Sequence, residues 1–340
     1  MNFSTEVKQK LLSIITEMNA CRWLFTKNPE TDFSRKKKWS FEEIMKFMLT
    51  MEGKALKDEL LEYFDFDNST PSNAAFNQRR AQILPEAFEF LFQEFTRSFN
   101  DNATYKGFKL IACDGSDLCI THNPKDKTTY FKPRPNDKGY NQLHLNVFYD
   151  LCSRRYTDAI ILIMKRIPFD YLDLHLNPFN EMKMRVVRFA ISQDSYECII
   201  TNLPQEKFSS DEIKQLYAKR WGIETSFREL KYALGLTRFH AKKPEYIMQE
   251  IWARMTLYNF CEIITMNVVT KKKANCKHIY QLNYTRAMRI CCYFLSTKKE
   301  KAPPDVEYLI GHELLPVRPG RSDPRKVKPQ SAISFLYRTA

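Results

Sequence analysis

The sequence lacks the cysteine spacings that hold small disulfide-rich or zinc-binding domains together. Its nine cysteines are odd in number, and no two of them form a Cys-x-x-Cys pair. This pattern argues against a disulfide framework and against a zinc ribbon, because both need paired or closely spaced thiols. The six histidines are also scattered without ligand spacing. We therefore expect a protein of a reducing cytoplasm.

Two other absences concern membranes and negative charge. No apolar run approaches the roughly 18 residues of a membrane helix, and Met1-Asn-Phe-Ser-Thr-Glu does not resemble a signal peptide. The 40 acidic side chains are outnumbered by 53 Lys and Arg, which leaves a net charge of +13. We expect no membrane association and a place in the compartment of the chromosome.

The excess of basic charge lies mostly at the end of the chain. Residues 271–340 hold 15 basic and 5 acidic side chains, so +10 of the +13 falls there. A polyanion such as DNA is the partner that this distribution favours, although a merely soluble basic tail would look the same. Within the tail, Arg318 and Arg321 are candidate DNA contacts in a segment that we expect to order only on binding.

Periodic apolar positions predict helices throughout residues 1–100, with breaks near Pro29 and Pro71. After the second break, Gln78, Arg79 and Arg80 place amide and guanidinium groups on one polar helix face. Such groups suit base edges and phosphates, as in a helix-turn-helix reader. The polar face of an ordinary helical bundle is an equal alternative.

From about residue 105 the pattern changes to strands. We expect a strand over 108–113 that ends on Asp114, a hairpin of 142–149 with 156–162, and a second strand pair of 182–191 with 196–201. A long helix should begin after Phe208, where Ser209 and Glu212 have capping-box spacing, and end near Gly235. A second long helix is expected over 244–265.

The helix 210–234 carries a row of functional side chains within an arc of about 80° and about 21 Å of axis. The row combines one carboxylate with hydrogen-bond donors, which suits phosphate chemistry with a divalent metal. An amphipathic surface helix with i,i+4 ion pairs is the alternative. The row consists of Tyr217, Arg220, Glu224, Arg228 and Lys231.

The spacing Tyr-x2-Arg-x3-Glu-x6-Lys of Tyr217, Arg220, Glu224 and Lys231 resembles the signature of the insertion-sequence-four family of bacterial transposases. Cys113-Asp114-Gly-Ser-Asp-Leu resembles that family's strand-ending Asp-Gly-Thr motif, which supplies the first catalytic aspartate. The resemblance implies an α/β fold: an RNase H-like core over 105–265, with a mixed sheet, flanking helices and a β-strand insertion at about 180–205. An all-helical DNA-binding domain over 1–100 would precede it, and a basic region over 266–340 would follow.

The resemblance also implies a reaction and its partners. Asp114 and Glu224 would be catalytic and would bind Mg2+ or Mn2+ for strand cleavage and strand transfer. Tyr217, Arg220, Arg228 and Lys231 would contact DNA phosphates. The DNA would be double-stranded, both transposon ends and target, bound by a homodimer on paired ends.

One part of the family pattern is missing. The second catalytic aspartate, expected on a further strand in an Asp-Arg-Gly context, is not found, and an internal deletion near 162–175 would explain this. That context is absent around Asp150, Asp170 and Asp173, which we interpret as turn or surface carboxylates. Three functions remain: an active transposase, an inactive remnant that only binds DNA, and a nuclease of similar fold without joining activity.

Overall fold

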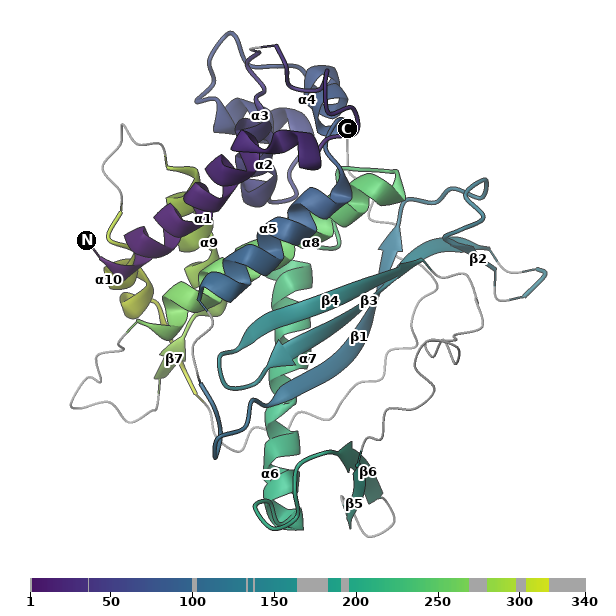
Figure 1. Cartoon of the computed structure of the whole chain (residues 1–340), viewed down its shortest axis with the longest axis vertical. Coiled ribbons are helices and arrows are strands. Elements are labelled where there is room, and N and C mark those ends of the chain that lie inside the picture. The colour runs from purple at the N-terminus through teal and green to yellow at the C-terminus, as the bar shows by residue number, and fades with distance from the viewer. Residues whose placement is uncertain are drawn as a thin grey trace.

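A computed structural model describes most of the chain, with helices and strands in an α/β arrangement (Figure 1). The described residues are 2–35, 37–99, 103–132, 134–136, 138–163, 183–190, 196–268, 280–297 and 304–317. Arg318, Arg321, Asp170, Asp173 and most of the expected deletion junction lie outside them. Among the described residues, no helix is both long and apolar enough to cross a membrane.

The first hundred residues form helices, as predicted. Their side-chain caps explain several starts: Asn2, Ser40 and Ser72 each accept a hydrogen bond from a backbone N–H in the first turn. Pro85 occupies the first turn of the last of these helices, where it costs no helix hydrogen bond. The helices are α1 (Phe3–Ala20), α2 (Phe41–Thr50), α3 (Leu56–Tyr63), α4 (Asn73–Arg80) and α5 (Pro85–Ser98), with a short 3-10 turn η1 (Arg22–Leu24) after α1.

These helices pack on α8 (Pro244–Met266), which confirms the helix expected over 244–265. The helix α8 is buried around nearly its whole circumference, from Ile247 to Thr265. One continuous apolar cluster joins it to α1, α2, α5 and the sheet, and α5 lies alongside it (Figure 1). A separate helical domain ending near residue 100 remains a prediction about independent folding.

The main sheet contains β1 (Ile111–Ile120), β2 (Tyr130–Phe131), β3 (Tyr140–Asp150) and β4 (Arg155–Ile163). The strand β3 pairs with β1 on one side and with β2 and β4 on the other. All these pairs are antiparallel, so the described strands do not form the mixed sheet that we expected. Both strands of the predicted 142–149/156–162 hairpin are confirmed.

Asp114 does not end its strand, which corrects the sequence interpretation. It lies within β1 opposite Val147, and the strand continues for six residues beyond it. Gly115 does not break the strand, because it allows a close approach by β3: a Cβ at this position would lie 2.6 Å from Nε2 of His144. Asp114 therefore projects from the middle of a strand, on the face that also carries the buried Leu118.

The second predicted strand pair is also confirmed, as β5 (Arg185–Ala190) and β6 (Tyr196–Thr201). It packs through Val187 against Phe208 and against α6 (Ser210–Lys219), in a small apolar cluster of its own. Ser209 caps α6 by accepting from the N–H of Glu212, as the capping-box spacing predicted.

The long helix expected over 210–234 is divided into three segments. The helix α6 gives way at Arg220 to α7 (Trp221–Arg228), which is followed by a π-helical turn η2 (Glu229–Ala233). Gly235 then ends the helical segment with φ near +70°, a left-handed conformation that favours glycine. Figure 1 shows α6 and α7 running one after the other past the sheet, with β5 and β6 beside α6.

The C-terminal part adds β7 (Tyr280–Leu282), α9 (Tyr284–Ser296), α10 (Val306–His312) and β8 (Leu314–Pro316). The strands β7 and β8 pair antiparallel, and α9 packs on α8. This basic region is therefore joined to the main core up to about residue 316.

Candidate active site

Two carboxylates from distant parts of the sequence meet at one guanidinium. Arg220 Nη1 lies 3.4 Å from Oδ2 of Asp114, and Arg220 Nη2 lies 3.1 Å from Oε1 of Glu224. The other oxygen of Asp114 accepts the N–H of Gly115 at 2.9 Å. All three charged side chains are about one-third exposed. The site is therefore open to solvent and to a large substrate.

The secondary structure explains why these residues meet. Arg220 and Glu224 are one helical turn apart, which places them on the same helix face. Arg220 stands at the joint of α6 and α7, where its N–H bonds the carbonyl of Tyr217 rather than the carbonyl four residues back. The helix α7 contacts β1, so this face meets the side of the sheet that carries Asp114.

Lys231 makes a second contact between the helix and β1. Its Nζ donates to Ser116 Oγ at 2.6 Å and to the carbonyl of Asp117 at 3.3 Å. Burial lowers the pKa of Lys231 from its usual value, and the Asp117 carboxylate partly offsets this effect. Ser116 lies two residues beyond Asp114 and on the same strand face, so the two contacts hold the helix along β1.

Tyr217 connects this cluster to the inserted strand pair. Its hydroxyl donates to Glu197 Oε1 at 2.7 Å, and the Arg220 guanidinium lies 5.0 Å from the centre of its ring. The hydrogen bond to Glu197 is the main reason that the pKa of Tyr217 is raised. Glu197, on β6, is a site residue that the sequence reasoning missed. Only the tertiary contact reveals it, because β6 has no motif around this residue.

Arg228 differs from the rest of the predicted row. It is exposed at the end of α7, and no contact to β1 holds it. Of the five side chains in the row, four therefore touch their neighbours in or beside the site, and Arg228 faces solvent.

Residues 137–260 match a family described as "Transposase DDE domain". The matched range contains β3, β4, the signature helix with Glu224, and most of α8. Two relatives from Escherichia coli share sequence with the chain. The transposase InsG of insertion sequence element IS4 (strain K12) is 28% identical over 131 residues, which are 36% of this chain and 29% of the relative. The transposase of insertion sequence element IS421 is 32% identical over 77 residues, 22% of this chain and 21% of the relative.

Residues 137–260 are therefore similar to the DDE domain of transposases from bacterial insertion sequences. The matched stretches span less than a third of either relative's length. Asp114 lies outside the range that matches the DDE domain, so its place in the site depends on its position opposite Glu224 rather than on the match.

The donor set of this candidate site fits a hard divalent cation. Asp114 and Glu224 offer carboxylate oxygens, and Mg2+ is commonly bound by one or two carboxylates together with water and substrate phosphates. Among the described residues, no cluster of three or more His, Cys, Asp or Glu side chains is placed to hold an ion. Asp150, which the sequence assigned to a turn, accepts from Cys152 N at 2.8 Å and from Ser153 Oγ at 2.9 Å.

Arg80 is not at the surface, which corrects its assignment as a DNA contact. It is 1% exposed, and its guanidinium donates to Glu250 Oε1 and Gln249 Oε1, both at 2.9 Å, and to the carbonyl of Tyr246. Buried charges are paired in this way because an unpaired one is costly. A helix of residues 73–80 was expected to expose this side chain, but its packing on α8 buries that face.

Arg79 and Gln78 differ from Arg80 in their surroundings. Arg79 is half-buried, donates to the carbonyl of Trp39 at 3.0 and 3.1 Å, and lies 4.2 Å from the ring centre of Phe33. Gln78 is exposed. Of the three DNA contacts predicted on α4, Gln78 is thus the most exposed.

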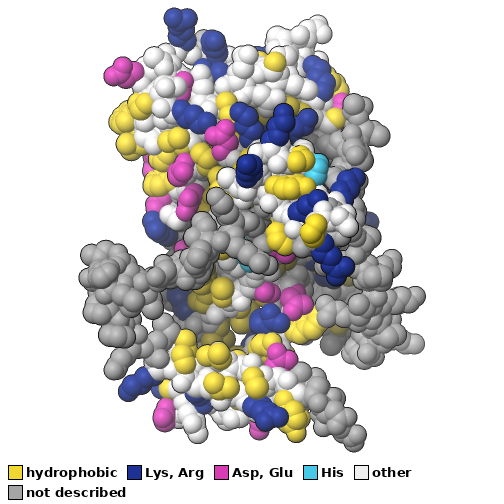
Figure 2. All heavy atoms as spheres, turned by 90° about the vertical axis from the view of Figure 1, so that its right-hand side faces the viewer, with side chains coloured by type: hydrophobic (Ala, Val, Ile, Leu, Met, Phe, Trp, Pro, Cys, Tyr) yellow, Lys and Arg dark blue, Asp and Glu magenta, His cyan; other side chains and the backbone are white. Residues whose placement is uncertain are grey.

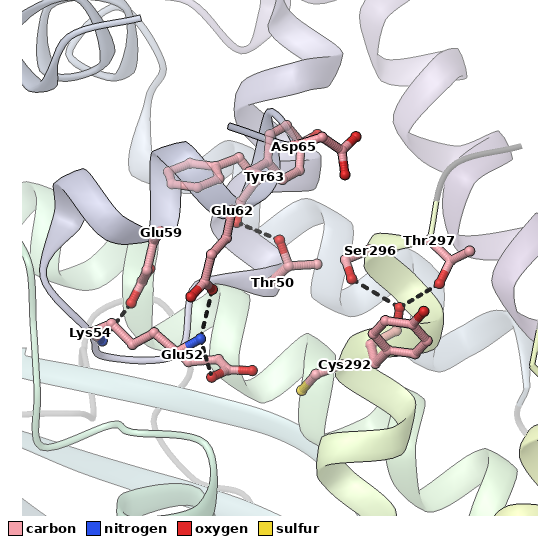
Figure 3. A pocket seen from close by; sticks show the side chains of 12 residues that line it. Thr50, Glu52, Lys54, Glu59, Glu62, Tyr63, Asp65, Cys292, Ser296 and Thr297 are labelled. Carbon is pink, nitrogen blue, oxygen red and sulfur yellow. Dashed lines mark hydrogen bonds and ion pairs between the residues drawn. The ribbon is translucent and has the colours of Figure 1, made fainter. Parts of the chain in front are cut away.

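A cavity of about 300 Å3 lies away from the DDE site, between α3 and α9 (Figure 3). Its acidic side chains include Glu52 and Glu62, and both contact Lys54. None of its lining residues belongs to the Asp114 cluster. The carboxylates of Asp114 and Glu224 therefore lie on an open surface rather than in this cavity.

Proposed function

We propose that this chain is a transposase that binds DNA and catalyses metal-dependent strand cleavage and strand transfer on an RNase H-like core. The observation that carries the proposal is that Asp114 on β1 and Glu224 on α7 both contact the guanidinium of Arg220. Two such carboxylates are adequate ligands for one Mg2+ or Mn2+ ion when substrate phosphate supplies further oxygens.

The roles of the residues follow from their positions. Asp114 and Glu224 hold the divalent ion. When bound, the ion polarises the phosphoryl group and lowers the pKa of the attacking water or DNA 3′-hydroxyl. Lys231 holds η2 on β1 through Ser116 and the carbonyl of Asp117, and its third N–H is left for a phosphate oxygen. The exposed Arg228 extends the donor row along the DNA backbone.

The partner is double-stranded DNA, both transposon ends and target. The net charge of +13 supports a polyanionic partner. Figure 2 shows Lys and Arg side chains spread over the upper part of one face, with Asp and Glu more frequent towards its left edge. Gln78, Arg79, Arg318 and Arg321 are proposed as further contacts, and a homodimer on paired ends is the proposed assembly. The eight described cysteines are free, which supports a cytoplasmic place near the nucleoid.

The test is strand cleavage by the purified chain on supercoiled plasmid and on linear DNA, with Mg2+ and with Mn2+. Asp114→Asn and Glu224→Gln should each reduce cleavage by about 100-fold or more, because each removes a metal ligand. Glu206→Gln, at an exposed position outside the site, is the matched control and should cleave normally. DNA binding without cleavage in either metal would refute the proposal and favour a remnant that only binds DNA.

A second measurement separates transposition from simple hydrolysis. The cleaved 3′-hydroxyl ends should join to a labelled target duplex in the same reaction, because one site serves both phosphoryl transfers. Cleavage without any joined product would identify the chain as a nuclease of similar fold.

A further inference from the structure

We propose that Arg220 closes the carboxylate site as an internal counter-ion, and that a divalent metal binds only when its guanidinium moves away. The inference rests on the proposed function, since it concerns how that site is regulated. It starts from the arrangement of three side chains: Arg220 reaches Asp114 with one terminal nitrogen and Glu224 with the other.

The arginine and the metal need the same oxygens. The guanidinium uses Asp114 Oδ2 and Glu224 Oε1. Mg2+ requires its ligand oxygens at about 2.0–2.1 Å. A divalent ion between these oxygens would lie within a few ångströms of a guanidinium of the same sign, where repulsion in a partly desolvated site is strong. The two cations therefore exclude each other.

The closed arrangement is weakly held. The distances of 3.4 and 3.1 Å are longer than the roughly 2.7–2.9 Å of a good charge-assisted hydrogen bond. Arg220 Nε is buried and has no hydrogen-bond partner among the described residues, so the guanidinium leaves one donor unsatisfied in this position. A better acceptor would draw the side chain away.

A DNA phosphate is such an acceptor, because it can take two parallel N–H bonds from arginine. The ring of Tyr217 offers a surface along which the guanidinium can move, and Glu197 fixes that ring through its hydrogen bond. DNA binding would thus pull Arg220 from the carboxylates and open the metal site. Metal would then bind more tightly to the DNA complex than to the free protein, and the coupling would be reciprocal.

The experiment measures Mn2+ affinity of the full chain by electron paramagnetic resonance of free Mn2+, without DNA. Removal of two partly exposed ion pairs predicts that Arg220→Gln binds Mn2+ about three- to tenfold more tightly than the unchanged protein. Lys219→Gln removes the same charge from the adjacent, exposed position, whose ammonium lies over the ring of Tyr105 instead, so its Mn2+ affinity should stay within about twofold. Circular dichroism and thermal unfolding verify that both variants fold. Arg220→Lys keeps the charge but cannot bridge both carboxylates. Its Mn2+ affinity should therefore lie between those of the unchanged protein and Arg220→Gln.

A second arm adds a 30-base-pair duplex of arbitrary sequence. The duplex should tighten Mn2+ binding by both proteins, because phosphate oxygens add metal ligands. It should tighten binding by the unchanged protein about three- to tenfold more than binding by Arg220→Gln, because only the unchanged protein has an arginine to displace. Equal Mn2+ affinities of Arg220→Gln and Lys219→Gln would overturn the proposal, since they would show a general effect of charge. If Mn2+ binds the unchanged protein and Asp114→Asn equally, the metal site fails as well, and the proposed function with it.

Discussion

Lys231 Nζ lies 2.6 Å from Ser116 Oγ, so the last residue of the signature row is hydrogen-bonded to the strand that carries Asp114. We expect Ser116→Ala to lower the free energy of unfolding by about 1 kcal/mol, because the half-buried ammonium loses its partner. Urea unfolding provides the measurement. Ser13→Ala removes a hydroxyl that bonds only a carbonyl of its own helix, and it should cost less than about 0.5 kcal/mol. Equal costs would show that the contact does not stabilise the fold.

Removal of the metal should separate catalysis from DNA binding. Chelation with EDTA is expected to abolish strand cleavage, because Asp114 and Glu224 then have no ion to present to the phosphate. Non-specific DNA binding should persist and weaken steeply as salt rises, since it depends on basic side chains. Gel-shift and cleavage assays on the same samples measure both. Undiminished cleavage in EDTA would contradict metal catalysis.

Arg80 should matter for stability rather than for DNA affinity. Arg80→Ala leaves the carboxylate of Glu250 in the core without its nearest cation and should cost about 3–5 kcal/mol. Gln78→Ala, two residues away and exposed, should cost less than about 0.5 kcal/mol. Chemical denaturation measures the free energy of unfolding of both variants. A mild Arg80→Ala variant with reduced DNA affinity would restore Arg80 as a surface contact.

His240 predicts a dependence of stability on pH. Burial lowers its pKa, but the carboxylates of Glu250 and Glu59 more than offset this, so the pKa of His240 is raised. The stability that its charged form contributes is therefore complete below the unfolded value of about 6.5 and is lost as the pH rises through the raised value. The two carboxylates, whose pKa values are lowered, contribute stability above about pH 4.5 that is lost in acid.

The measurement compares His240→Asn with the unchanged protein by urea unfolding at pH 6 and pH 9. The difference in unfolding free energy should be larger at pH 6 and should shrink towards pH 9, where the raised pKa of His240 has been passed. Gln78→Ala, a non-titrating substitution at an exposed position, is the control, and its difference should not change with pH. A difference for His240→Asn that grows with pH would show that the histidine is neutral in the folded protein.

Local patterns in the sequence predicted most of the elements. Periodicity located the helices of residues 1–100 and α8, and alternation located β3 to β6, because these signals depend on neighbours within a few residues. The break at Arg220 and the position of Asp114 within β1 were not predicted. Both depend on how β1 meets β3 and α7, and spacing along the chain contains no information about such contacts.

Spacing along the sequence also predicted part of the candidate site. Glu224 and its companions share a helix face, so spacing was enough to group them, whereas Asp114 was joined to them by resemblance. Glu197, Ser116 and the burial of Arg80 depend on contacts between residues 20 to 170 positions apart. No single-sequence pattern reports such pairs.

The nearly complete burial of α8 limits how the protein can be dissected. Its surface is covered on one side by α1, α2 and α5, so a fragment that begins near residue 105 would leave a broad apolar stripe without a covering layer. Such a fragment would carry both Asp114 and Glu224 and would nevertheless tend to aggregate. The first hundred residues therefore cover the apolar surface of α8, in addition to being a candidate DNA-binding region.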